Sequence, residues 1–149
     1  MKTGDVCNRE VVFIQRDASV FEAAALMREH HVGDLVVVEE QNGRRAPVGI
    51  LTDRDLVLEV IAEGVDLGGV VVGDIMSFEL VTAGEDDDLF DTLKRMRLKG
   101  VRRLPVVDRS GALVGIVTVD DLLDLLAEQV SDLARIIQRE QTRERERRR

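Results

Sequence analysis

The feature that most constrains the fold of this chain is an internal repeat. The segment GILTDRDL at positions 49–56 returns as GIVTVDDL at positions 115–122, 66 residues later. Further upstream the two copies are 69 residues apart, since the GDV at 4–6 corresponds to the GDI at 73–75. The difference falls in a polar turn between two predicted strands, where a hairpin tolerates a change of length. The sequence therefore predicts two copies of one structural unit.

Each copy predicts the order strand, helix, strand, strand, helix. In the first copy we expect a strand at 11–14, a helix that ends near His30, strands at 35–39 and 47–51, and a helix after Thr52. In the second copy we expect a strand at 80–82, a helix that ends near Lys99, strands at 104–108 and 113–117, and a helix after Thr118. The helices show apolar residues every three or four positions, and a turn that contains glycine joins each pair of later strands.

A unit this small cannot bury the apolar face of its sheet and the apolar stripes of its helices alone. We therefore expect an α+β fold in which two β-α-β-β-α units pack with approximate two-fold symmetry into one module, with a cleft between them. The units are assigned to residues 1–66 and 67–129, and residues 130–149 to a charged helical tail.

The charge and the apolar runs limit the partners of the chain. A net charge of −8 argues against broad binding of nucleic acid, because phosphate would be repelled by most of the surface. No apolar run approaches the roughly 18 residues that span a bilayer, and charges occupy the start of the chain where a signal peptide is apolar. The single cysteine, Cys7, cannot form an internal disulfide. These features predict a cytoplasmic protein that does not enter a membrane.

The end of the chain combines a helical seam with a run of arginines. Leu126, Val130, Leu133 and Ile137 are spaced by 4, 3 and 4 residues, which predicts that the last helix continues past the second copy. The seam is expected to pack either on its own module or on a second subunit. Residues 139–149 hold six arginines and three glutamates, typical of a solvated helix end or of a contact for an acidic partner, RNA or a membrane surface.

A threonine and an aspartate recur at the start of the second helix of each copy. Thr52 precedes Asp55 by three residues, and Thr118 precedes Asp121 likewise. This spacing fits a capping box that needs no ligand. It also fits a nucleotide site, because a helix N-terminus favours phosphate and a carboxylate can accept hydrogen bonds from both hydroxyls of a ribose. The chain lacks a GxxxxGK[ST] or GxGxxG loop, so neither a P-loop NTPase nor a Rossmann domain is indicated.

The paired pattern resembles the CBS domain, the regulatory motif named after cystathionine β-synthase. The segments that carry the resemblance are VGDIMS and GVRRLPVVDRSGALVGIVTVDDLL in the second copy and HHVGDLVVVEEQNGRRAPVGILTDRDLV in the first. The resemblance implies that two motifs form one module whose cleft binds an adenosine nucleotide such as AMP, ADP or ATP. Some members of the family bind NAD or S-adenosylmethionine instead.

The resemblance also implies two crossed sites, each joining the threonine and aspartate of one motif to the early strands of the other. The first site would consist of Thr52, Arg54, Asp55, Thr82, Ala83, Val101, Arg102, Arg103 and Leu104. The second would consist of Thr118, Asp120, Asp121, Ile14, Gln15, Val32, Gly33, Asp34 and Leu35. Arginines then gather in the first site and aspartates in the second. We therefore expect the first site to bind a phosphorylated adenosine ligand, and the second to bind weakly, to bind a less anionic ligand or to stay empty.

The sequence thus predicts a regulatory module with a nucleotide as its ligand, no cofactor of its own and a homodimeric state, which signals to an unidentified partner or its sister subunit. No catalytic set is visible. His30 and His31 are assigned to a turn and the EDDD at 85–88 to a helix start, so no metal site is expected. The alternatives are a constitutive dimerisation or interaction module with empty sites, in which Thr52 and Thr118 only cap helices, and a sensor of NAD or S-adenosylmethionine.

Overall fold

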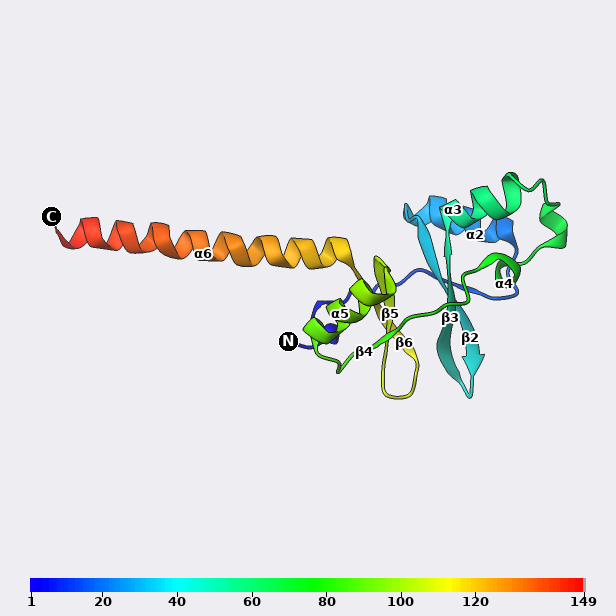
Figure 1. The fold of residues 1–149 in the computed structure, drawn as a ribbon, viewed down its shortest axis with the longest axis horizontal. Coiled ribbons are helices and arrows are strands. Elements are labelled where there is room, and N and C mark those ends of the chain that lie inside the picture. Colours follow the sequence, from blue (N-terminus) through cyan, green and yellow to red (C-terminus); the bar gives the residue numbers. More distant parts are fainter. Residues whose placement is uncertain (149) are drawn as a thin grey trace.

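The computed structural model describes residues 1–148 and shows two three-stranded sheets beside each other, one from each copy of the repeat (Figure 1). In each sheet a short strand pairs in parallel with a longer strand, which pairs antiparallel with the third. The strands are β1 Phe13–Gln15, β2 Asp34–Gln41, β3 Arg44–Thr52, β4 Ala83–Gly84, β5 Arg103–Val107 and β6 Leu113–Thr118. The predicted α+β fold with two repeated units is confirmed.

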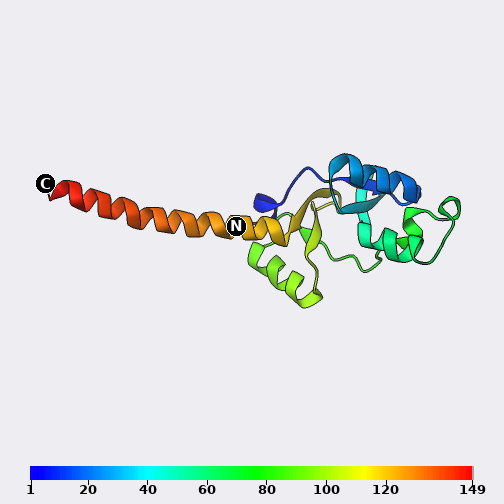
Figure 2. The ribbon, with the colours of Figure 1, turned by 90° about the horizontal axis from the view of Figure 1, so that it is seen from above.

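Helices flank both sheets, and one of them extends far beyond the body of the protein (Figure 2). The helices are α1 Thr3–Val6, α2 Val20–His30, α3 Asp53–Leu56, α4 Val72–Ile75, α5 Leu89–Lys99 and α6 Val119–Arg147, with a π-helical turn at Val57–Ile61 and a 3-10 turn at Leu67–Gly69. The predicted ends of α2 and α5 are confirmed, since residues with left-handed backbone follow at His31 and Gly100. Arg149, the last residue of the predicted tail, lies outside the described residues.

The first hairpin is longer than predicted, and the first strand of each copy begins later. Asn42 and Gly43 have φ angles of 54° and 76°, as a type I′ turn requires, so strand pairing continues up to a two-residue turn. The strands expected at 11–14 and 80–82 start two and three residues later, because only there does the backbone pair with the neighbouring strand. The apolar pattern starts earlier than the strand because the preceding residues also pack on the cores.

The N-terminal segment packs on the second half of the module, not on the first. Thr3 N donates a hydrogen bond of 2.8 Å to Asp87 O. Asn8 N donates one of 2.9 Å to Ile116 O on β6, and Ile116 N donates one of 2.9 Å to Asn8 O. Residues 3–8 thus extend the second half although they precede the first in sequence.

The segment between the copies packs on the first half in the equivalent way. Val72 N donates a hydrogen bond of 2.9 Å to Ala18 O, and Ser77 N donates one of 2.9 Å to Ile50 O on β3. These contacts repeat those of the N-terminal segment at the repeat spacing. The boundary assigned between residues 66 and 67 divides the sequence, but the two halves exchange segments across it, which joins them into one body.

Two glycines of the repeat make this exchange possible. A Cβ atom at Gly49 of β3 would lie 2.8 Å from the carbonyl oxygen of Ser77. A Cβ atom at Gly115 of β6 would lie 3.0 Å from that of Asn8 and 2.6 Å from the sulfur of Cys7. The glycine of the repeated GI dipeptide is therefore required where the exchanged segment crosses the last strand of each sheet.

The second helix of each copy ends differently because of one residue. In the first copy, Gly64 adopts a φ of 65° and its amide donates to Ile61 O. The next amide, that of Val65, donates to Val60 O, which completes a Schellman motif. The position 66 residues later is Val130, whose branched side chain disfavours a left-handed backbone, and α6 continues past it.

The two halves have cores of unequal size. The larger core contains Ile14, Val20, Ala23, Met27, Leu35, Val37, Leu51, Leu56, Val60, Val72 and Met76. The smaller core contains Ala83, Met96, Leu104, Val106 and Val117. Val60 is 2% exposed, whereas its equivalent Leu126 is 60% exposed, because α6 leaves the body (Figures 1 and 2). Of the two alternatives for the seam of the last helix, packing on its own module is therefore contradicted, and packing on a second subunit stays a prediction.

A buried pair of hydroxyl groups joins α1 to α5. The Oγ1 atoms of Thr3 and Thr92, both fully buried, share a hydrogen bond of 2.7 Å, and Thr3 Oγ1 also donates to Asp87 O at 3.1 Å. The equivalent positions of the other half hold Val72 and Ala23, which are fully buried in the larger core. The same position in the fold is thus occupied by a polar pair in the second half and by an apolar pair in the first half.

We predict that Gly49→Ala destabilises the protein by about 1–3 kcal/mol, because the new methyl group displaces the backbone of the exchanged segment. Gly69→Ala is the matched control. Nothing lies within 4 Å of its Cβ position, so its effect is expected to stay within about 0.5 kcal/mol. Urea unfolding measures both. An equal loss in the two variants would show that the crossing at β3 is not tight.

We further predict that Thr3→Val costs about 1–3 kcal/mol, because the Thr92 hydroxyl is left buried without this partner. The double variant Thr3→Val/Thr92→Ala copies the apolar pair of the other half and is expected to lose less than the sum of the two single variants. A double-mutant cycle by urea unfolding gives the coupling. Additive losses would contradict a stabilising hydroxyl pair.

Candidate functional site

Thr52 and Asp55 form the capping box that their spacing predicts. Asp55 N donates a hydrogen bond of 3.1 Å to Thr52 Oγ1, and Thr52 N donates one of 2.9 Å to Asp55 Oδ2. Asp53 N donates to Gly33 O at 2.9 Å, and Arg54 N donates to Asp53 Oδ1 at 2.8 Å. The first three amides of α3 are therefore all hydrogen-bonded within the chain, which fixes the threonine at the end of β3.

The second copy forms only half of this box. Asp121 N donates a hydrogen bond of 3.1 Å to Thr118 Oγ1, and Val119 N donates one of 2.9 Å to Arg102 O. Within residues 1–148, the reciprocal bond from Thr118 N to the Asp121 carboxylate is not formed. The two aspartates thus differ, because the carboxylate of Asp55 takes part in capping and that of Asp121 does not.

A cavity of about 280 Å³ lies beside Thr52, at the junction of the two halves. Its lining residues are Ile50, Thr52, Ser77, Glu79, Leu80, Val81, Val101, Arg102 and Arg103. The first two belong to β3, and the others belong to the segment before β4 and to the start of β5. The cavity therefore has a crossed arrangement, with the threonine of one copy facing the early strands of the other.

Four of the nine residues predicted for the first site line this cavity, and five do not. Those that line it are Thr52, Val101, Arg102 and Arg103. Those outside are Arg54, Asp55, Thr82, Ala83 and Leu104. The side chains of Ala83 and Leu104 are buried in the smaller core, and the Thr82 carbonyl accepts a hydrogen bond of 2.8 Å from Arg95.

Sequence reasoning did not assign the other lining residues to the site. They are Ile50, Ser77, Glu79, Leu80 and Val81. Ile50 lies two residues before Thr52, so the alternation of a strand places both side chains on one face and is a signal in the sequence. The Ser77–Val81 segment carries no such signal, since it depends on the backbone pairing of Ser77 with Ile50.

The equivalent cavity is not closed around Thr118. A larger hollow of about 560 Å³ on the other side is lined by Asn8, Glu10, Val11, Val12, Phe13, Leu26, His30 and Val32. Five of these are repeat equivalents of residues that line the first cavity: Asn8, Glu10, Val11, Val12 and Val32. Of the nine residues predicted for the second site, only Val32 is among them.

None of the other eight residues predicted for the second site lines this hollow. They are Thr118, Asp120, Asp121, Ile14, Gln15, Gly33, Asp34 and Leu35. Ile14 and Leu35 are buried in the larger core. Gln15 lines a surface hollow with Arg16 and Asp17. The structure therefore gathers residues of the first predicted site more fully than those of the second.

The predicted separation of charge between the sites is wrong. Arg102 Nη2 lies 3.9 Å from Asp120 Oδ1, and Arg103 Nη1 lies 3.7 Å from Asp34 Oδ1. Each arginine of the cavity thus forms an ion pair with a carboxylate assigned to the second site. The third arginine assigned to the first site by sequence, Arg54, is exposed on α3.

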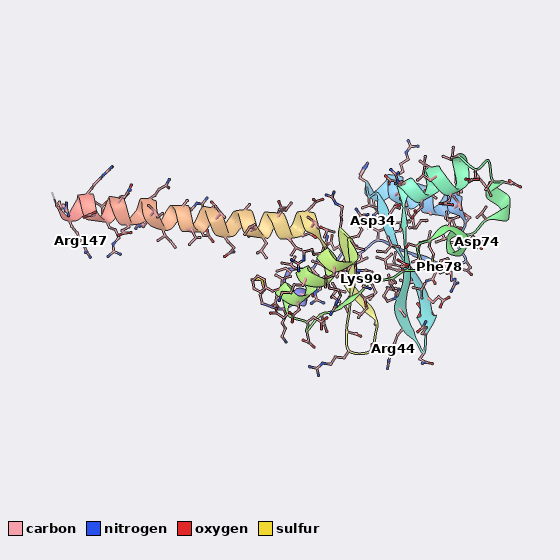
Figure 3. All side chains as sticks on the ribbon, in the orientation of Figure 1. Asp34, Arg44, Asp74, Phe78, Lys99 and Arg147 are labelled. Carbon is pink, nitrogen blue, oxygen red and sulfur yellow. The ribbon has the colours of Figure 1, made fainter. Side chains whose placement is uncertain are left out.

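The Arg103–Asp34 pair lies partly buried between the halves, with side chains 34% and 22% exposed. Burial raises the pKa of Asp34, the neighbouring Arg103 lowers it, and the nearby Asp53 raises it further. Figure 3 shows Asp34 at the upper end of β2. Arg103 therefore serves two environments, the cavity on one side and a partly desolvated carboxylate on the other.

Within residues 1–148, no group of three or more His, Cys, Asp or Glu side chains is placed to hold a metal ion. None of the helices in that range is both long and apolar enough to cross a membrane. The polar side chains that line the cavity are the hydroxyls of Thr52 and Ser77, the guanidinium groups of Arg102 and Arg103, and the carboxylate of Glu79. The hydroxyl and guanidinium groups suit an anionic group of a ligand, whereas the carboxylate suits ligand hydroxyls.

Comparison with known proteins places this geometry in a family. The family model of the CBS domain matches twice, over residues 4–62 and 72–128. The chain is 39% identical over 118 residues to the CBS domain-containing protein YhcV of Bacillus subtilis, covering 79% of this chain and 80% of that protein. It is 40% identical over 125 residues to the uncharacterized protein MK0525 of Methanopyrus kandleri, covering 84% of this chain and 62% of that protein.

The fold is shared with solved structures as well. The CBS domain pair of protein MJ0100, solved in complex with 5′-methylthioadenosine and S-adenosyl-L-methionine, superposes with a TM-score of 0.72 at 26% identity. The match covers 87% of this chain and 98% of that one. Because both repeats match the family model and the two motifs superpose as one body, this chain belongs to the CBS domain family as a tandem pair.

Proposed function

We propose that this CBS pair is a regulatory module, not an enzyme, that binds an adenosine nucleotide in the cavity beside Thr52. The observation that carries the proposal is the meeting of Thr52 with Arg102 and Arg103 in one cavity made by both halves. The hydroxyl group of Thr52 and the two guanidinium groups together suit a phosphate group. The MJ0100 pair, which holds two adenosine derivatives, supports the choice of an adenosine ligand.

Nucleotide binding at this site requires the two arginines to exchange partners. The cavity of about 280 Å³ is just below the roughly 300–1,000 Å³ of small-molecule sites, so the site must open slightly. The Arg102–Asp120 pair is mostly exposed, and such a pair contributes at most about 1 kcal/mol. A phosphate offers both arginines stronger, charge-assisted hydrogen bonds, so the carboxylates are displaced.

Occupancy of this cavity is suited to signalling because its lining comes from both halves. A ligand that prefers one relative arrangement of the halves shifts the population toward it. We propose that a partner protein or a sister subunit in a homodimer reads this shift. The cytoplasmic location and the homodimer stay predictions from the sequence.

A second candidate function is a constitutive interaction module with empty sites. It is favoured by the apolar side chains on the outer faces of the first helices, where Phe21 and its repeat equivalent Phe90 are 72% and 65% exposed. It is also favoured by the caps at Thr52 and Thr118, which are formed by the protein alone. Thermal stabilisation by none of AMP, ADP, ATP, NAD and S-adenosylmethionine would support it.

We predict that Thr52→Val lowers the affinity for AMP at least about fivefold, because one hydrogen bond of about 1 kcal/mol to the ligand is lost. Thr118→Val is the matched control. Both variants remove an equivalent helix cap, at a similar cost of about 0.5–2 kcal/mol in stability, but only Thr52 faces the cavity. Calorimetry with AMP, with urea unfolding of each variant, separates binding from stability. Equal losses of affinity would contradict a preferred first site.

We also predict that Asp120→Asn tightens AMP binding by about two- to fivefold, because Arg102 no longer has to leave a carboxylate. Asp124→Asn, one turn further along α6, removes the same charge without an ion pair to the cavity and serves as the control. Calorimetry at low and high salt measures both. If both variants tighten binding equally, the gain comes from net charge and not from Arg102.

A further inference from the structure

α6 carries an apolar stripe that nothing from its own module covers. Six large apolar side chains of the stripe are between 56% and 62% exposed: Leu123, Leu126, Val130, Leu133, Ile136 and Ile137. They recur every three or four residues along a helix that points away from both halves (Figures 1 and 2). A stripe with this period has the geometry of a seam between two helices.

The charges along α6 are divided between its two ends. Residues 119–134 contain five acidic side chains and no lysine or arginine. Residues 135–148 contain six arginines and three glutamates, and Figure 3 shows Arg147 at the far end of the helix. Two such helices laid in parallel would place like charges beside each other. Two laid antiparallel would place the acidic start of one beside the basic end of the other.

The seam itself favours the antiparallel orientation. Beyond Ile137 the next two seam positions are occupied by Glu140 and Glu144. In a parallel pair each of these carboxylates would face its own copy across the seam, which is unfavourable. In an antiparallel pair they lie near the start of the partner helix, where the helix dipole favours a negative charge.

We propose that α6 pairs with α6 of a second copy of this chain in antiparallel orientation, centred midway between Leu126 and Ile137, at Ser131 and Asp132. This interface is separate from the proposed nucleotide site, and its formation does not depend on nucleotide binding. In this register Arg143 of one copy lies level with Asp120 of the other. The arginines near the end of α6 of the second copy thereby lie beside Asp120 and Asp121, where β6 of the first copy joins α6.

Disulfide trapping tests both the pairing and its orientation. All variants carry Cys7→Ser, so that the native thiol does not react, and one variant of each mixture carries a size tag. Leu126→Cys and Ile137→Cys are oxidised separately and as a mixture. In the proposed register residue 126 of one copy faces residue 137 of the other, whereas two copies of residue 126 are about 16 Å apart along the axis, too far for a disulfide.

The expected result is a disulfide-linked dimer that is mostly the mixed species, with little from either variant alone. Replacing Ile137→Cys by Gln138→Cys, which lies off the seam, is the matched control and is expected to abolish trapping. Homotypic dimers from each variant alone would indicate parallel pairing and overturn the proposal, as would the absence of any trapped dimer. AMP binding by the same reduced variants is measured alongside, so a failure of nucleotide binding is seen separately.

Discussion

The close crossing of backbones at Gly49 and Gly115 is the constraint on which the rest of the structure depends. At each crossing a segment from the other side of the sequence lies against the last strand of a sheet and shares backbone hydrogen bonds with it. Any side chain larger than hydrogen would separate the two backbones. Each half therefore supplies a segment to the other half, and the core of each half packs against residues of the segment that it receives.

The crossed cavity follows from the same contact. Because Ser77 N donates to Ile50 O, the chain that continues from Ser77 toward β4 must run past the end of β3, where Thr52 caps α3. The residues that follow Ser77 thereby become lining residues of a site whose threonine belongs to the other copy. Packing of the exchanged segments thus creates the junction of the halves. Arg102 and Arg103 supply its chemistry, and each also forms an ion pair with a carboxylate at the junction.

The parts of the fold with local causes could be predicted from the sequence. The caps at Thr52 and Thr118 and the ends of α2 and α5 follow from short-range signals, and the paired units follow from the internal repeat. The exchange of segments and the ion pairs could not, because they join residues of different copies. Yet Asp34 and Arg103 are repeat equivalents, and equivalent residues next to a two-fold axis face each other. Opposite charges at two repeat-equivalent positions therefore indicate an ion pair across the axis. Assigning residues to each site separately does not reveal such a pair.

Differences between the copies fall into two kinds, and the distinction bears on function. Where the halves contact their exchanged segments, the differences compensate, as when Thr3 and Thr92 stand in place of Val72 and Ala23. Where each copy faces outward, they do not, and Val130 in place of Gly64 turns a helix that stops into one that projects. Uncompensated differences leave the shared packing intact, so they are free to specialise each copy. The specialised surface of this pair is therefore expected along α6, and not in the cores.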